Sequence, residues 1–103
     1  MNYKVIVSEQ AERDLNGIYS YIYRKLKSKS SAERVALRLR GAMVGLSVLP
    51  KRYRVYPMEP WLSREIRSVA VGNYVLFYLV KDAESEVWIT RIVNGQRDMK
   101  KAL

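Results

Sequence analysis

Residues 65–98, EIRSVAVGNYVLFYLVKDAESEVWITRIVNGQRD, contain most of the strand signal in this chain. Three short runs rich in β-branched and aromatic residues occur here: Ile66–Val71, Tyr74–Val80 and Val87–Val93. Gly72-Asn73 separates the first two runs, and the polar segment Lys81–Ser85 separates the last two. Short apolar runs bounded by such turn residues are typical of consecutive antiparallel strands. The stretch therefore predicts a three-stranded meander.

Three arginines accompany these strands. Arg67 and Arg91 lie inside the first and third runs, and Arg97 follows the third. Burying an unpaired guanidinium is very costly, so each arginine must reach solvent or a polar concavity. Because the runs are apolar on both faces, we expect one face of the sheet to be covered. The other face is expected to be at least partly sheltered and to form a concave, partly basic surface.

Composition excludes several classes of chemistry. The 103 residues suit a single domain spanning residues 1–103. Cysteine and histidine are both absent, which excludes disulfides, thiolate or imidazole metal sites and catalysis by imidazole. No cofactor or metal is expected, because no motif for either is present. The sequence has no membrane-length apolar run and no signal-peptide layout, so we expect a cytoplasmic protein without a membrane partner.

Charge is the strongest compositional signal. Nineteen Lys and Arg residues against ten Asp and Glu give a net charge of +9. A small basic domain usually binds an anionic partner, either nucleic acid or an acidic protein. The alternative is a soluble basic surface without a specific partner.

Two amphipathic helices are predicted before the meander. A first strand at Tyr3–Val7 leads into a helix over Glu9–Leu26, whose apolar residues recur at helical spacing. A second helix is predicted over Ser31–Leu49, because Ser30–Glu33 resembles a capping box and Pro50 ends the pattern. So short a link makes the two helices an antiparallel hairpin. Its expected core residues are Leu15, Ile18, Ile22, Leu39, Met43 and Leu46. For Tyr19, Tyr21 and Tyr23, helical spacing favours packing over a nucleic-acid platform.

The segment Pro50–Arg64 contains every proline of the chain and is expected to be an ordered, irregular loop. It mixes cations with aromatic rings: Lys51, Arg52, Tyr53, Arg54, Tyr56, Trp61 and Arg64. Single-stranded nucleic acids are bound by such mixtures, in which cations contact phosphates and rings stack on bases. The alternative is that the rings cover the core while the cations face water, and the sequence favours neither.

The predicted order of elements is β-α-α-β-β-β, an α+β fold with the helical hairpin on one face of a mainly antiparallel four-stranded sheet. Together with Val71–Tyr78 and the closing segment Arg91–Asp98, this order resembles the RelE/ParE toxins. The N-terminal Tyr3–Ser8, followed by a helix with Ala11, Asp14 and Leu15, is also similar to that superfamily. The resemblance implies the toxin of a bacterial type II toxin–antitoxin pair. It further implies a cognate antitoxin that binds the toxin in a hetero-oligomer.

Two activities occur in the family that the chain resembles. RelE-like members are ribosome-dependent mRNA endoribonucleases with cationic residues on the sheet, and ParE-like members poison DNA gyrase. Arg97 matches the arginine that follows the last strand in the RelE pattern. Val75 falls where that pattern has an arginine on the third strand, and the late tyrosine of the pattern has no counterpart after Arg97. The resemblance therefore favours the ParE-like activity.

The candidate site residues depend on which activity is present. In an endoribonuclease, Arg67, Arg91 and Arg97 would be the catalytic candidates. Residues expected to bind the target or nucleic acid are Lys51, Arg52, Arg54, Arg64 and Arg97. A third possibility is a basic nucleic-acid-binding module that is not toxic.

Overall fold

The computed structural model describes residues 2–96 and residue 99. Its helices and strands are β1 (Lys4–Val7), α1 (Glu9–Leu26), α2 (Lys29–Gly45), β2 (Arg67–Val71), β3 (Tyr74–Lys81) and β4 (Glu86–Asn94). Two 3-10 turns occupy Pro50–Arg52 and Asp82–Glu84. The predicted order of elements and the α+β architecture are confirmed.

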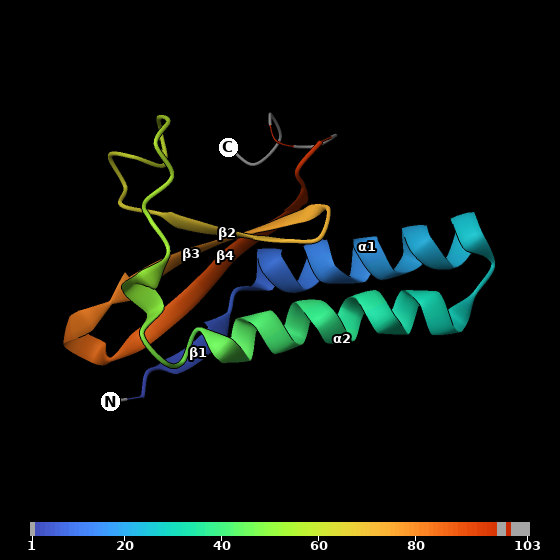
Figure 1. The fold of residues 1–103 in the computed structure, drawn as a ribbon, viewed down its shortest axis with the longest axis horizontal. Helices are drawn as coiled ribbons and strands as arrows, with labels where there is room; N and C mark the ends of the chain where they lie inside the picture. Colours follow the sequence, from blue (N-terminus) through green and yellow to red (C-terminus); the bar gives the residue numbers. More distant parts are fainter. Residues whose placement is uncertain (1, 97–98, 100–103) are drawn as a thin grey trace.

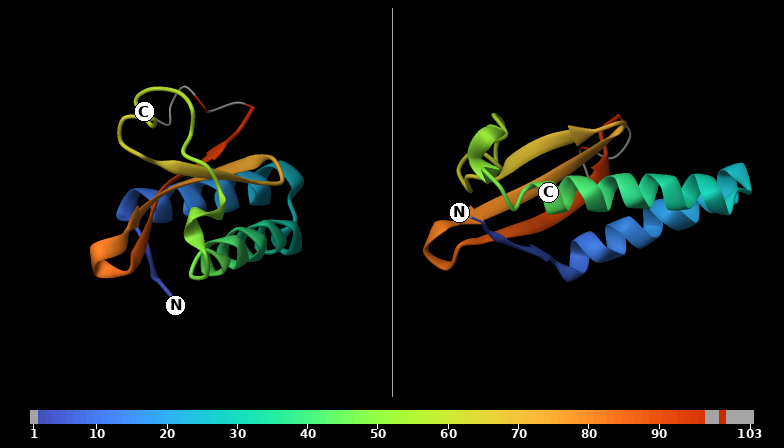
Figure 2. Two further views of the ribbon diagram at one scale, coloured as in Figure 1. Left: turned by 60° about the vertical axis from the view of Figure 1, so that its left-hand side comes forward. Right: turned by 60° about the horizontal axis from the view of Figure 1, so that its bottom comes forward.

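The sheet has the strand order β1-β4-β3-β2. Strands β2, β3 and β4 form the predicted antiparallel meander, and β1 pairs in parallel with β4. Parallel neighbours need a long crossover connection, and here the chain passes through both helices between β1 and the meander. Figures 1 and 2 show the two helices lying antiparallel beside one face of the sheet.

The main core lies between the helices and the sheet. Its buried residues are Ala11, Leu15, Leu39, Met43, Leu46, Val71, Leu76, Tyr78, Val87, Ile89 and Ile92. Of the six residues predicted for the hairpin core, five are buried and Ile18 is partly buried against this cluster. The helical spacing of apolar residues thus identified the inner face of both helices.

The second helix is shorter at its C-terminus than predicted. It ends at Gly45 instead of Leu49. It begins at Lys29 instead of Ser31, because Ser28 caps it by accepting a hydrogen bond from the Ser31 amide at 3.2 Å. Beyond the helix, the Tyr3 amide donates to the Ser47 carbonyl at 2.7 Å, and Val48 forms an isolated bridge with Asn2. Pairing with the N-terminal segment therefore replaces the last predicted helical turn.

The second face of the sheet is covered by an aromatic cluster where a concave, partly basic surface was predicted. Trp61, Phe77 and Val93 form a separate buried cluster here, with Tyr56 and Val75 packed against it. Tyr56 and Trp61 come from the irregular segment after α2, which Figure 1 shows rising past β2. Its backbone pairs with the edge of β2 through an isolated antiparallel bridge between Val55 and Arg67. Loop aromatics therefore build the second core.

The outer surfaces of the helices are polar with scattered apolar residues. The packing prediction is wrong for Tyr21 and Tyr23, which are exposed, while Tyr19 is partly buried. Within the part of the chain that the structure describes, neither helix combines the length and the hydropathy that crossing a membrane would need.

Candidate functional site

A bulge in β4 determines where its arginine points. Arg91 pairs with Phe77, whereas the next residue of β3, Tyr78, pairs with Ile89, so Thr90 is an extra residue. The Thr90 hydroxyl donates to the Phe77 carbonyl at 3.1 Å. An extra residue reverses the alternation of side chains along a strand. Ile89 and Ile92 consequently both reach the helix-side core, and Arg91 lies on the opposite face with Phe77.

Past Ile89, the edge of β4 has α1 as its neighbour in place of β1. The pairing with β1 ends at Val7 and Ile89, and the Ser8 hydroxyl then donates to the Thr90 carbonyl at 3.2 Å. Further along α1, the Asp14 carboxylate accepts a hydrogen bond from the backbone amide of Ile92 at 2.9 Å. A side chain of the helix thus takes the place of a neighbouring strand.

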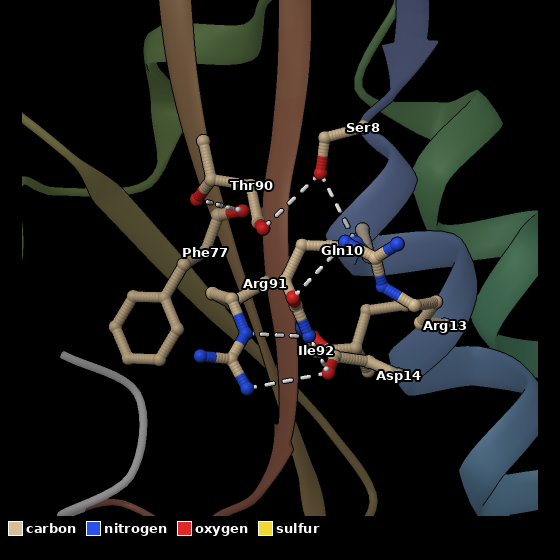
Figure 3. A network of polar contacts seen from close by, with 9 residues as sticks. Ser8, Gln10, Arg13, Asp14, Phe77, Thr90, Arg91 and Ile92 are labelled. Atoms are coloured by element: carbon tan, nitrogen blue, oxygen red, sulfur yellow. Dashed lines mark hydrogen bonds and ion pairs between the residues drawn. The ribbon is translucent and has the colours of Figure 1, made fainter.

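Asp14 also forms an ion pair with Arg91, at 2.8 Å from Nε and 3.2 Å from Nη2 (Figure 3). Gln10 Nε2 also donates to the carboxylate, at 3.0 Å. The side chains of Arg91 and Asp14 are only 26% and 10% exposed. Such a bidentate pair fixes the guanidinium and balances its charge.

Two hollows meet at Arg91. One, of about 250 Å³, lies between α1 and the ends of β3 and β4, and is bordered by Arg13, Asp14 and Tyr74 among others. The other, of about 220 Å³, is bordered by Gln10, Trp61, Arg64 and Arg91. The structure therefore places Arg64 and Arg91, two of the predicted site residues, around one cavity.

Arg67 lies on the other face of the sheet. It pairs with Tyr78, whose ring is in the helix-side core, and directly opposed side chains share a face. Its Nη1 donates to the Tyr53 carbonyl at 2.7 Å. The Tyr78 hydroxyl donates to the Pro50 carbonyl at 2.6 Å. Burial raises the pKa of Tyr78 to about 12, although the nearby Arg67 charge lowers it. Tyr78 therefore stays protonated at neutral pH and is unsuited to act as a base.

The loop cations nearest Arg67 are held in structural contacts. Lys51 forms an ion pair with Asp82, which also accepts a hydrogen bond from the Tyr3 hydroxyl at 2.8 Å. Asp82 accepts hydrogen bonds from Lys51 and Tyr3, and both lower the pKa of its carboxyl group, the one from Lys51 more than the one from Tyr3. The hydrogen bond between Lys51 and Asp82 also raises the pKa of Lys51. Arg52 donates to the carbonyls of Gly45, Val48 and Leu49, so it caps the C-terminal end of α2.

The comparisons with known proteins agree with this fold. The model of the ParE toxin of type II toxin–antitoxin systems, parDE, matches residues 5–99, which is most of the chain. The chain belongs to the ParE toxin family. No curated protein matches the sequence.

Two solved structures share the ParE-family fold of this chain. One is the chromosomal ParDE toxin–antitoxin system from P. aeruginosa, with 19% identity over 89% of this chain and 95% of that chain, and a TM-score of 0.73. The other is the RelBE2 toxin–antitoxin complex from Mycobacterium tuberculosis, with 23% identity over 91% of this chain and 92% of that chain, and a TM-score of 0.64.

Apart from Arg64 and Arg91, the structure does not bring together the predicted site residues that it describes in this ParE-family chain. Arg54 and Arg64 are exposed and form no ion pair with any residue in the described part of the chain. Arg97 lies outside the described residues. Val75 is partly buried against the aromatic cluster, so the position that carries an arginine in the RelE pattern contributes here to packing.

Sequence reasoning did not assign a role to Asp14 or Gln10. A signal for Asp14 is present, because this carboxylate lies next to Leu15 and three residues after Ala11, at the border of the apolar stripe. A lone carboxylate at such a border is close enough to the sheet to need a partner. The partner itself, Arg91, is 77 residues away in sequence and is brought there by the parallel crossover.

Proposed function

We propose that this toxin arrests bacterial growth by poisoning DNA gyrase. The observation that supports this proposal most is that Arg67 and Arg91 point to opposite faces of the sheet. Phosphoryl transfer without histidine needs several cationic donors aimed at one phosphate. Two arginines separated by a sheet are not arranged for that task.

The contacts that the two arginines make also argue against a nuclease site. Arg91 forms a bidentate pair with Asp14, so a phosphate approaching its guanidinium would also meet a carboxylate. Arg67 donates to a backbone carbonyl of the loop. Val75 supplies an apolar side chain where the RelE pattern has a cation. A toxin that binds its target, as the ParE-like resemblance implies, needs no convergent phosphate site.

We further propose that a cognate antitoxin neutralises the toxin in a hetero-oligomer in the cytoplasm. The two structural neighbours are both toxin–antitoxin systems. A net charge of +9 favours a partner with acidic side chains. The exposed cations Arg54 and Arg64 are candidates for target contact. Arg97 remains a further candidate from the sequence.

A ribosome-dependent endoribonuclease is the second candidate. One observation favours it: Arg64 and Arg91 border the same hollow of about 220 Å³. In that case Arg91 would have to exchange Asp14 for the scissile phosphate, and Arg97 would supply a further donor.

Two measurements on cells that express the toxin separate the candidates. For a gyrase poison we expect trapped gyrase–DNA cleavage complexes and no codon-phased cuts in mRNA by primer extension. Arg97→Ala should weaken the trapping, and the matched variant Lys4→Ala, a change at an exposed cation of β1, should not. Codon-phased cuts that disappear in Arg97→Ala would overturn the gyrase proposal. Growth that continues unimpaired at high levels of folded toxin would overturn both.

A further inference from the structure

The far end of the helical hairpin projects beyond the sheet. Figures 1 and 2 show α1 and α2 continuing well past the turn that joins β2 to β3. We call residues 19–34 of this end the hairpin tip. Within it Ile22 and Ala32 are buried, whereas residues 23–27 are all exposed. Unlike the rest of the helices, the hairpin tip does not cover the sheet.

Charge is concentrated on the hairpin tip. It carries five cations and a single carboxylate, Glu33, which gives +4 of the chain's net +9. The cations are Arg24, Lys25, Lys27, Lys29 and Arg34. Lys29 begins α2, whose first turn has no acidic residue, so this cation opposes the helix dipole. Its ion pair with Glu33, at 3.9 Å with side chains 73% and 51% exposed, adds little stability. Helix stability therefore does not account for a cation at this position.

Aromatic rings are exposed beside these cations. The rings of Tyr19 and Tyr23 stack with centroids 6.5 Å apart and planes 20° from parallel. Tyr21 and Tyr23 are 40% and 48% exposed. Arg24 borders two shallow hollows on the hairpin tip, one next to Tyr19 and Tyr23 and the other next to Tyr21 and Lys25. Its Nε donates to the Ser20 carbonyl at 3.3 Å, which keeps the guanidinium close to the helix backbone.

We propose that the hairpin tip binds single-stranded nucleic acid. The exposed face of Tyr23, supported from behind by Tyr19, stacks on a base, and Arg24, Lys25 and Lys27 contact the phosphates on either side. Proteins that bind single strands combine exposed aromatic faces with cations in this way. An acidic protein segment would use the cations but would gain little from flat exposed rings. The site is separate from the strand arginines, so it does not depend on which target the toxin inhibits.

Fluorescence anisotropy of the full-length chain with a labelled oligothymidylate of about 12 nucleotides tests the proposal, a length within the range that single-strand sites accommodate. Tyr23→Leu should weaken binding about tenfold, because each stacked base contributes on this order. Tyr23→Phe keeps the ring and should bind as the unmodified chain does. An abasic strand of equal length lacks the base that stacks on Tyr23. The unmodified chain should therefore bind this strand about as weakly as Tyr23→Leu binds the normal strand.

Matched charge variants separate a local site from general attraction. Lys25→Gln should reduce the slope of log affinity against log salt by about 0.7, the value for one phosphate contact on a single strand. Lys4→Gln removes the same charge from β1 and should leave the slope unchanged. Equal effects of the two lysine variants, or equal binding by Tyr23→Leu and the unmodified chain, would overturn the proposal. Binding of an oligoglutamate in preference to the strand would overturn it in favour of an acidic protein partner.

Discussion

The two faces of the sheet are packed by different kinds of structure. On one face, regular helices contribute Leu15, Leu39 and Met43 to the core. On the other, an irregular loop contributes Tyr56 and Trp61, which pack on the strand residue Phe77. Apolar periodicity predicts the first face from sequence. The second face has no periodic signal, because a loop can bring its rings over the sheet at any spacing.

The aromatic face also shows how a basic, ring-containing segment is to be interpreted. Trp61 stacks on Phe77 with centroids 5.4 Å apart, and Tyr56 meets both rings edge-on at 5.0 and 5.4 Å. Rings used in this way are unavailable to nucleic-acid bases. On the hairpin tip, by contrast, Tyr21 and Tyr23 are exposed beside cations. Exposure of the rings, which the sequence does not reveal, distinguishes a packing segment from a binding segment.

The largest expected effect tests whether the two faces are equally part of the fold. Phe77→Ala should lower the free energy of unfolding by about 3–5 kcal/mol, and Leu39→Ala by about 2–5 kcal/mol, because both side chains are fully buried. Urea unfolding measures both values. Leu37→Ala, on the exposed side of the same helix as Leu39, is the control and should stay within about 0.5 kcal/mol. If Phe77→Ala lowers the free energy of unfolding by less than about 0.5 kcal/mol, the limit set for Leu37→Ala, the aromatic cluster does not stabilise the fold and is not a second core.

The next effect concerns the helix-side face at alkaline pH. Burial raises the pKa of Tyr78 to about 12 from its ordinary value of 10.0, so the folded state favours the neutral phenol. A group whose pKa is raised on folding contributes its full stability below the unfolded pKa and loses it as the pH rises through the folded pKa. The loss should therefore occur between about pH 10 and pH 12 and amount to about 2–3 kcal/mol.

Tyr78→Phe provides the reference for this measurement, because lysines also titrate in the same range. The stability advantage of the unmodified chain over Tyr78→Phe, from urea unfolding at several pH values, should shrink by about 2–3 kcal/mol as the pH rises from about 10 to about 12. An advantage that stays constant across that range would mean that Tyr78 does not titrate as its burial requires.

Much of the fold could be predicted from the sequence, because most elements carry their own local signals. The helix Glu9–Leu26 was predicted with the observed bounds from the helical spacing of its apolar residues. The end of α2 was not, because residues 47 and 48 pair with the N-terminal segment, and such a tertiary contact has no local signal.

The candidate site was harder to predict than the fold. Regular alternation of side chains along β4 would put Arg91 on the same face as Val87 and Ile89. This is the helix side of the sheet, where Arg67 also lies. The bulge at Thr90 moves it to the other side, since one extra residue inverts every later side chain. No glycine or proline marks the bulge in this strand. The separation of the two arginines, which supports the proposed function, was therefore not accessible from sequence.

The smallest expected effect concerns the edge where the two faces meet. Asp14 joins α1 to β4 by pairing with Arg91 and accepting the Ile92 amide, and the pair is largely shielded from solvent. Glu12 and Arg40 form a pair of similar length, 2.9 Å, between α1 and α2, but their side chains are nearly half exposed.

A double-mutant cycle with Asp14→Asn and Arg91→Met should give a coupling energy of about 1–2 kcal/mol. The cycle with Glu12→Gln and Arg40→Met should give about 0–1 kcal/mol, because water screens exposed pairs. If the coupling of Asp14 with Arg91 is no larger than that of the exposed pair, the guanidinium is readily released. Arg91 would then be available to bind a phosphate, a result that would support the nuclease proposal and weaken the gyrase proposal.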